Sequence, residues 1–236
     1  MQPVMAETKT ETKEPRWKLA LRAFVRLSLI LVTLLAAGGL HWLRGWIFAA
    51  LFLASYVTAL AVIRRKNPAL IRVRLKKLQP TKPFDKVFVA LYITAFLAFL
   101  VVAGLDGGRF GWSALRFRWI WPGMVLHLAG ALPVTWAAAT NPYLETTVRI
   151  QNDRGHTTIT GGPYRLVRHP MYTGILVSFS GWPLILGSLW SYIPVVVVVA
   201  LFVFRTARED QTLRTELSGY SDYCRRTRYR LLPGIW

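Results

Sequence analysis

The sequence predicts an all-α integral membrane protein with about six transmembrane helices. Hydrophobic residues make up 53% of its 236 positions, the mean hydropathy is +0.35, and ten residues are tryptophan. Apolar runs close to the roughly 20 residues that a membrane-spanning helix needs alternate with polar stretches. Lys and Arg outnumber Asp and Glu by 30 to 11, and they gather in a few loops and in both tails. These patterns are typical of a chain that crosses a bilayer several times.

Four predicted spans occupy the N-terminal half of the chain. They cover Leu19–Leu40, Trp46–Ile63, Val87–Leu105 and Trp119–Ala139. Arg22 and Arg26 interrupt only the beginning of the first span, where long basic side chains can reach the interface. Between the spans, Arg64–Lys86 is predicted as a basic loop and Asp106–Arg118 as a Gly-rich loop. His127 lies in the middle of the fourth span, where we expect a hydrogen bond between helices rather than catalysis.

Two shorter apolar runs, Ile175–Leu186 and Leu189–Phe204, predict a helical hairpin. Pro183 and Pro194 indicate kinked or tilted helices, so the hairpin either crosses the bilayer fully or is re-entrant. After it, Arg205–Tyr223 is expected to form a cytoplasmic amphipathic helix that leads into a basic tail.

The distribution of charge predicts the orientation. With six spans, both termini lie on the same side of the membrane, together with 26 of the 30 Lys and Arg residues. The other side holds only Arg44, Arg109, Arg116 and Arg118. Because positive charge is retained on the cytoplasmic side, both termini are predicted to be cytoplasmic. Residues 1–18 are polar and contain no cleavage signal, and we expect them to form a disordered tail.

The composition argues against several other classes of function. A net charge of +19 alone could indicate nucleic-acid binding, but the basic residues flank apolar segments. The lipid bilayer is therefore the expected partner and nucleic acid is not. Cys224 is the only cysteine, which excludes an intrachain disulfide, and the four histidines lack the spacing of a metal site. The sequence leaves the oligomeric state open.

A polar and basic stretch, Thr160–Gly174, precedes the hairpin directly. Gly161, Gly162 and Pro163 predict a turn, and Pro170 suits the first turn of a helix. Backbone N–H groups and the positive end of the dipole would favour an anionic group at that helix terminus. Taken alone, the Arg-His pair within the stretch is better explained by a basic, aromatic juxtamembrane anchor.

A second polar segment follows the hairpin. Arg205 and Glu209 are four residues apart and share a helix face at the end of an apolar span. A surface ion pair would account for them, although ionisable residues at membrane depth are more often functional. Since one hairpin separates the two polar segments, we expect them to meet at the cytoplasmic face.

Together the two segments resemble the isoprenylcysteine carboxyl methyltransferase family and the related membrane phospholipid methyltransferases. His156–Gly174 is similar to that family's H-T-x-x-T-x-G-x-Y…R-H-P-x-Y-x-G signature. Arg205–Pro233 is similar to its R-x-x-x-E-[ED]-x-x-L motif, which is followed by G-x-x-Y and a late proline. The resemblance implies a membrane-embedded methyltransferase core at residues 140–236, preceded by N-terminal transmembrane helices at residues 19–139.

The resemblance also implies S-adenosylmethionine as cofactor, held in a pocket at the cytoplasmic face. Matched by position, the implied cofactor-binding residues are Gln151, His156, Thr157, Thr158, Ile159, Tyr164, Arg168, His169, Pro170, Met171, Tyr172 and Glu209. The implied catalytic residues are Arg205, on an acceptor carboxylate, and Glu209. Consistent with this, the chain has no G-x-G-x-x-G dinucleotide motif.

The methyl acceptor is expected to be a hydrophobic or lipid-linked molecule, and its carboxylate, thiol or amine chemistry stays open. Two other hypotheses remain. A membrane reductase of the sterol-reductase type would bind NADPH, and a non-enzymatic scaffold or small transporter would bind no cofactor.

Overall fold

The computed structural model describes residues 28–75, 81–113 and 115–236. Within these ranges the chain forms helices and irregular segments without a strand, which confirms the all-α prediction. The predicted tail at residues 1–18 and the beginning of the first predicted span lie outside the described residues. Residues 28–36, in the second half of that span, are helical.

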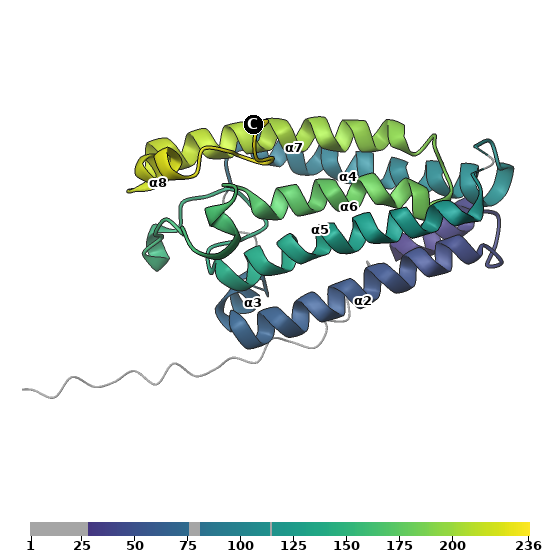
Figure 1. The fold of residues 1–236 in the computed structure, drawn as a ribbon, viewed down its shortest axis with the longest axis horizontal. Coiled ribbons are helices and arrows are strands. Elements are labelled where there is room, and N and C mark those ends of the chain that lie inside the picture. Colours follow the sequence, from purple (N-terminus) through teal and green to yellow (C-terminus); the bar gives the residue numbers. More distant parts are fainter. Residues whose placement is uncertain (1–27, 76–80, 114) are drawn as a thin grey trace, which may run out of the picture.

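Five long helices lie side by side in one bundle (Figure 1). They are α2 (Leu43–Lys66), α4 (Pro83–Ala103), α5 (Ile120–Thr140), α6 (Pro170–Leu186) and α7 (Tyr192–Glu216). Three stretches are long and apolar enough to cross a membrane: Leu43–Lys66, Pro83–Phe110 and Phe117–Thr140. Helix α6 is apolar but shorter. An integral membrane protein is therefore supported, whereas the number of six spans stays a prediction.

Three local predictions need correction. The last predicted span and the helix expected over Arg205–Tyr223 are largely one continuous helix, α7, and a separate short helix, α8 (Tyr220–Arg226), follows after Gly219 adopts a positive φ of 78°. The predicted basic loop contains helix α3 (Pro68–Leu75), in whose first turn the backbone N–H of Leu70 donates to the side-chain oxygen of Asn67 at 3.3 Å. The predicted Gly-rich loop begins as a π-helical turn, η1 (Gly104–Phe110), that extends α4.

Helices α5 and α6 approach each other so closely that glycine is required at their contact. A Cβ atom on Gly130 would lie 2.3 Å from the carbonyl oxygen of Gly174, and one on Gly174 would lie 2.4 Å from that of Gly130. Gly123 and Gly181 repeat this arrangement elsewhere along the two helices. A Cβ atom on Gly123 would lie 2.7 Å from the carbonyl oxygen of Gly181, and one on Gly181 would lie 2.5 Å from that of Gly123. Small residues let two backbones meet in a bilayer, where packing rather than the hydrophobic effect holds helices together.

Aromatic side chains fill the space between α4, α6 and α7. Phe179 and Trp182 of α6 are buried, with ring centroids 4.1 Å apart, and Phe202 of α7 meets Phe88 of α4 edge to face at 5.2 Å. His127 accepts a hydrogen bond from the indole of Trp182 at 2.9 Å and lies 3.0 Å from the hydroxyl of Ser55. The expected hydrogen bond of His127 between helices is therefore confirmed.

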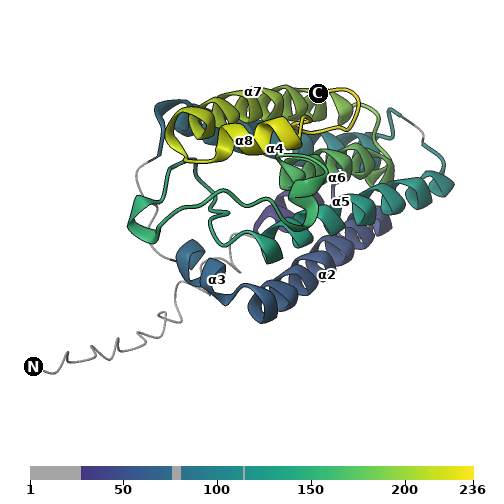
Figure 2. The same ribbon diagram turned by 60° about the vertical axis from the view of Figure 1, so that its left-hand side comes forward.

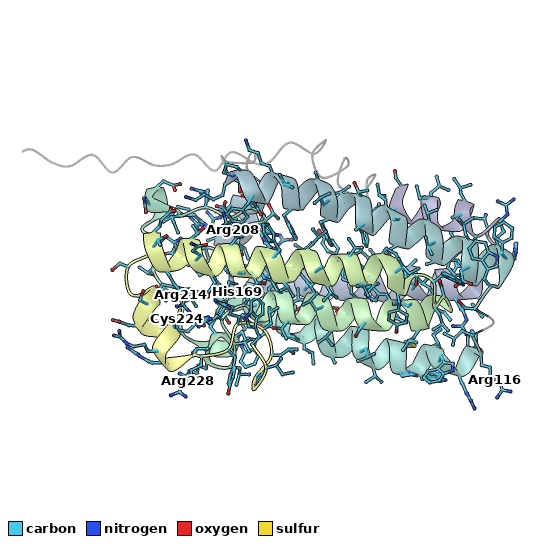
Figure 3. The ribbon with its side chains drawn as sticks, turned by 90° about the horizontal axis from the view of Figure 1, so that it is seen from above. Arg116, His169, Arg208, Arg214, Cys224 and Arg228 are labelled. Atoms are coloured by element: carbon cyan, nitrogen blue, oxygen red, sulfur yellow. The ribbon has the colours of Figure 1, made fainter. Side chains whose placement is uncertain are left out.

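The irregular segments and the short helices gather at the ends of the bundle. Helices α3 and α8 and the segment between α5 and α6 lie at the same end (Figures 1 and 2). His169, Arg208, Arg214 and Arg228 are found at this end, whereas Arg116 lies at the opposite one (Figure 3). The two polar segments that flank the hairpin therefore meet.

Candidate active site

A cavity lies at the end of the bundle where α3 and α8 are located. It encloses about 510 Å³ of empty space, including the part that opens to solvent. Four parts of the chain form its wall: the residues after α5, the segment that leads to α6, the last turns of α7, and α8. The lining residues are Asn141, Leu144, His156, Thr157, Thr158, Ile159, Tyr164, Arg168, His169, Pro170, Met171, Tyr172, Glu209, Leu213, Leu217, Tyr220 and Tyr223.

Of the residues expected to bind a cofactor, the structure brings all but Gln151 into this wall. The side chain of Gln151 is buried elsewhere, where its amide donates to the carbonyl of Tyr143 at 2.7 Å and its oxygen accepts from Arg154 at 2.5 Å. His156 does line the cavity, with its ring 4.4 Å from that of Tyr143. Burial first, and then the charges of Arg154 and Arg149, lower the pKa of His156, so its ring is neutral at pH 7.

Glu209 and His169 face the same cavity and are linked through Tyr172. The hydroxyl of Tyr172 donates to a carboxylate oxygen of Glu209 at 2.5 Å, and its ring stacks parallel to that of His169 with centroids 5.6 Å apart. A carboxylate from α7 and an imidazole at the N-terminus of α6 are thereby fixed on one wall. The wall offers hydrogen-bond acceptors, donors and aromatic faces together.

Asp210, the neighbour of Glu209, is fully buried behind this wall. Its carboxylate pairs with Arg168 at 2.9 Å and with Arg230 and Arg214 at 3.1 Å each, and it accepts from the hydroxyl of Tyr220 at 3.0 Å. Burial opposes ionisation, but hydrogen bonding and charge from His169, Arg168 and Arg230 outweigh it and hold the pKa of Asp210 well below its ordinary value. The network ties α7, α8 and the segment before α6 to one point.

The C-terminal loop, residues 229–236, packs directly against the turn that carries His169. The backbone N–H of Arg168 donates to the carbonyl of Tyr229, and that of His169 to the carbonyl of Arg230, each at 2.9 Å. Carbonyls of the C-terminal loop therefore already occupy these two N–H groups, and the binding of an anionic group at the N-terminus of α6 stays a prediction. The hydroxyl of Thr173 extends the contact by donating to the carbonyl of Leu231 at 2.7 Å.

Arg205 lies outside the cavity lining. Its guanidinium pairs with the fully buried Asp85 of α4 at 2.9 Å, donates to the carbonyl of Thr146 at 2.8 Å, and sits 4.4 Å from the centre of the Phe88 ring. It is also 5.4 Å from the ring of Tyr172. Arg205 is thus one layer behind the cavity wall, whereas Glu209 lies in it. Among the described residues, no three His, Cys, Asp or Glu side chains gather as a metal site requires.

Residues 119–218 match the family described as phospholipid methyltransferase. The match includes α5, the segment that lines the cavity, α6 and the whole of α7. This region of the chain is similar to the phospholipid methyltransferase family. The family region thus supplies most of the cavity wall, and Tyr220 and Tyr223 of α8 complete it from beyond the matched residues.

Three curated proteins illustrate what else the chain is similar to. The Delta(14)-sterol reductase TM7SF2 of Mus musculus is 35% identical over 85 residues, which are 35% of this chain and 20% of the relative. The cobalt-zinc-cadmium resistance protein CzcN of Cupriavidus metallidurans is 33% identical over 134 residues, or 54% of this chain and 56% of the relative. The Delta(14)-sterol reductase erg24 of Schizosaccharomyces pombe is 30% identical over 99 residues, or 41% of this chain and 23% of the relative. The matches therefore span about half of one relative and about a fifth of the other two.

Several contacts at this end of the bundle could not be predicted from the sequence. Asp85 and Arg230 are partners of motif residues but lie far from them in sequence, so no local pattern could have shown the pairing. Tyr220, the tyrosine of the G-x-x-Y motif, reaches both the cavity and the carboxylate of Asp210. A buried acid between basic partners was foreseeable for Asp210, because it follows Glu209 on a helix rich in arginine.

Proposed function

We propose that the protein is an S-adenosylmethionine-dependent membrane methyltransferase that acts on a lipid-like or small hydrophobic acceptor. The observation that carries the proposal is the composition of the cavity wall. A region of the phospholipid methyltransferase family contributes its His156–Ile159 segment, its Arg168–Tyr172 turn and Glu209 to one cavity. The proposal extends the family assignment to a cofactor and a class of acceptor.

The lining suits the chemistry of this cofactor. S-adenosylmethionine carries an amino acid group, a ribose, an adenine and a positively charged sulfonium. Glu209 can accept hydrogen bonds from amino or ribose groups, and the threonine hydroxyls can donate or accept them. Four tyrosine rings line the cavity, and aromatic faces attract a cation. The ring of His169 forms part of the wall, and its buried Nε2 faces Asp210 at 3.6 Å.

A membrane reductase that uses NADPH is the second candidate, supported by the two sterol reductases among the relatives. NADPH carries a pyrophosphate and a further phosphate, which proteins hold with several arginines, lysines or free backbone N–H groups. Arg168 is the only Lys or Arg among the lining residues, and its guanidinium is paired with Asp210. The wall therefore favours a ligand with little negative charge, which supports S-adenosylmethionine over NADPH.

The protein's part in methyl transfer would be mainly to orient the reactants. The bound cofactor would supply an electrophilic methyl group on its sulfonium. Glu209, Tyr172 and His169 would hold it in one orientation, and the apolar residues Leu213 and Leu217 would exclude water beside them. Holding two reactants in line at contact distance can lower a barrier by about 7–11 kcal/mol at most. A strong general base is unnecessary when the acceptor is anionic, because such an acceptor has no proton to lose.

The acceptor is proposed to reach the cavity from the bilayer, because the cavity lies where α6 begins and where the apolar part of α7 ends. The isoprenylcysteine carboxylate of the resembling family is one candidate, and a thiol or an amine is another. A role for Arg205 on an acceptor carboxylate would require it to exchange its buried pairing with Asp85. We place the cavity and both termini in the cytoplasm, in accordance with the 26 basic residues predicted on that side.

A methyl-transfer assay tests the proposal. The purified full-length chain would be given S-adenosylmethionine with a labelled methyl group and matched twelve-carbon acceptors that end in a carboxylate, a thiol or an amine, as well as phosphatidylethanolamine. Label should enter one class of acceptor, and the mass of the product should rise by one methyl group. Absence of transfer to every class, in a sample that binds the cofactor, would restrict the function to cofactor binding and contradict the proposed reaction.

A further inference from the structure

The C-terminal loop, residues 229–236, lies outside the region matched to the family and lines no part of the cavity, yet it contacts the cavity wall from behind. Its carbonyls accept from the backbone N–H groups of Arg168 and His169 and from the hydroxyl of Thr173. These three groups belong to the turn that places His169 in the wall and to the first turn of α6.

Arg230 fixes the loop to the core of the bundle. Its guanidinium pairs with the fully buried carboxylate of Asp210 at 3.1 Å and lies 4.8 Å from the centre of the Trp236 ring. The backbone N–H groups of Arg230 and Leu231 donate to the carbonyl of Trp236 at 2.7 and 3.0 Å, which closes the loop on itself. The side chain of Arg230 therefore holds the C-terminal loop in place, and the loop holds the Arg168–His169 turn.

The same carboxylate also binds the turn directly. Asp210 pairs with the side chain of Arg168 at 2.9 Å, while the backbone N–H of Arg168 donates to the carbonyl of Tyr229, the neighbour of Arg230. A network of this kind strengthens each contact, because a buried charge left without a partner is costly. Removing Arg230 would loosen the loop and leave Arg168 as the main buried partner of Asp210.

We propose that Arg230 is a positioning residue of the cofactor site: through Asp210 and the carbonyls of Tyr229 and Arg230 it holds the Arg168–His169 turn in the cavity wall. The effect on the cofactor rests on the proposed function, whereas the effect on the turn does not. Arg230 is not part of the cavity lining, so the loss of its side chain acts on the ligand only by way of the turn. The C-terminal loop thus orders this part of the cavity wall in the ligand-free protein.

Hydrogen exchange tests the effect on the turn in the full-length protein without ligand. The amides of Arg168 and His169 should be protected in the wild type, and Arg230→Ala should accelerate their exchange while leaving the amides of α5 unchanged. Arg228→Ala is the matched control, because Arg228 is an exposed arginine close to the loop (Figure 3). Equal protection of the turn in Arg230→Ala and the wild type would overturn the proposal.

Binding of S-adenosylhomocysteine, measured by calorimetry on the same samples, adds the functional readout. Arg230→Ala should raise its Kd roughly tenfold, within the range found for energetically coupled positions, and Arg230→Lys should recover part of the loss. A purely structural role would lower the unfolding temperature without changing Kd at a temperature where both variants are folded. If the wild type does not bind S-adenosylhomocysteine, the proposed function fails, and the exchange experiment still decides the role of Arg230.

Discussion

The two ends of the helix bundle each contain a fully buried carboxylate, but the groups that satisfy it differ. At the cavity end, Asp210 and Asp85 are paired with arginines. At the opposite end, Asp106 accepts from the backbone N–H and the hydroxyl of Ser113, from the hydroxyl of Ser188 at 2.7 Å and from the N–H of Trp190 at 3.4 Å. All of these donors to Asp106 are neutral. At the cavity end the two carboxylates also accept from neutral donors, Tyr220, Thr81 and Val148, but arginines add ion pairs to them.

The difference between the partners of these carboxylates corresponds to two structural roles. At the far end, neutral donors join η1 to the connection between α6 and α7. At the cavity end, charged partners join four separate segments around the cavity: α4, the segment before α6, α7 and the C-terminal loop. We conclude that the far end is built for closure and the cavity end for holding functional groups apart at fixed positions. The following changes would break or sharpen that comparison.

The largest expected effect is that of Arg205→Ala on stability. The change leaves Asp85 buried without its cationic partner, which typically costs about 3–5 kcal/mol. Equilibrium unfolding in mixed micelles measures the loss. Arg214→Ala is the control: Arg214 also contacts a buried carboxylate, but its side chain is 44% exposed and Asp210 keeps other partners, so the change should be below about 1 kcal/mol. A stable Arg205→Ala protein with altered acceptor kinetics would instead support a direct role on the acceptor.

Glu209→Gln is expected to weaken binding rather than folding. The substitution keeps the shape but removes the charge that accepts from Tyr172 and faces the cavity, so S-adenosylhomocysteine binding should weaken by about 1.5–3 kcal/mol. Calorimetry and a thermal melt on one sample separate the two effects. Glu216→Gln, on the same helix but in an exposed pair with Lys82, should leave Kd unchanged. Unchanged affinity in Glu209→Gln would remove Glu209 from the site.

Gly174→Ala and Gly181→Ala probe the same α5–α6 contact nearer to either end. Each added methyl group would meet a backbone oxygen, at 2.4 and 2.5 Å, and overpacking of this kind costs about 1–3 kcal/mol. Both variants should therefore melt earlier. Gly174 follows the turn of the cavity wall, so only Gly174→Ala should also raise Kd. Gly161→Ala is the control, because a Cβ atom there meets nothing within 4 Å; equal effects of all three changes would contradict the packing argument.

A smaller effect is expected from pH. The pKa of Asp210 is lower in the folded protein than the value of about 3.9 typical of an unfolded chain. Its contribution to stability is therefore complete above that value and is lost as the pH falls below about 4 toward the folded pKa. Thermal melts between pH 3 and 7 should show this loss, and Asp210→Asn should flatten it. A wild-type melting temperature that is constant below pH 4 would contradict the assignment.

The sequence predicted the helices because their signal is local. The runs expected at Trp46–Ile63, Val87–Leu105 and Trp119–Ala139 correspond to α2, α4 and α5 with shifts of a few residues, since apolar composition over some 20 positions defines each of them. The continuous course of α7 was missed because charge near Arg205 was interpreted as the start of a new element, although nothing there breaks a helix. Helix α3 was missed despite Pro68, which suits a first helical position.

The sequence predicted which residues line the cavity but not which residues hold them in place. Motif spacing placed His169 and Glu209 at the same end, and they do face one cavity. The partners of the wall residues come from distant parts of the chain: Asp85 precedes Arg205 by 120 positions, and Arg230 follows Asp210 by 20. Such pairings depend on how α4, α7 and the C-terminal loop pack together, and no periodicity or motif encodes them.

The central claim, that the cavity holds a sulfonium cofactor, is tested most directly by titrating the wild-type protein in lipid nanodiscs with S-adenosylhomocysteine and, separately, with NADPH. The account predicts saturable binding of S-adenosylhomocysteine at one site per chain, weakened in Glu209→Gln, with no heat from NADPH. Binding of NADPH alone, or binding of S-adenosylhomocysteine that survives unchanged in Glu209→Gln, would contradict it.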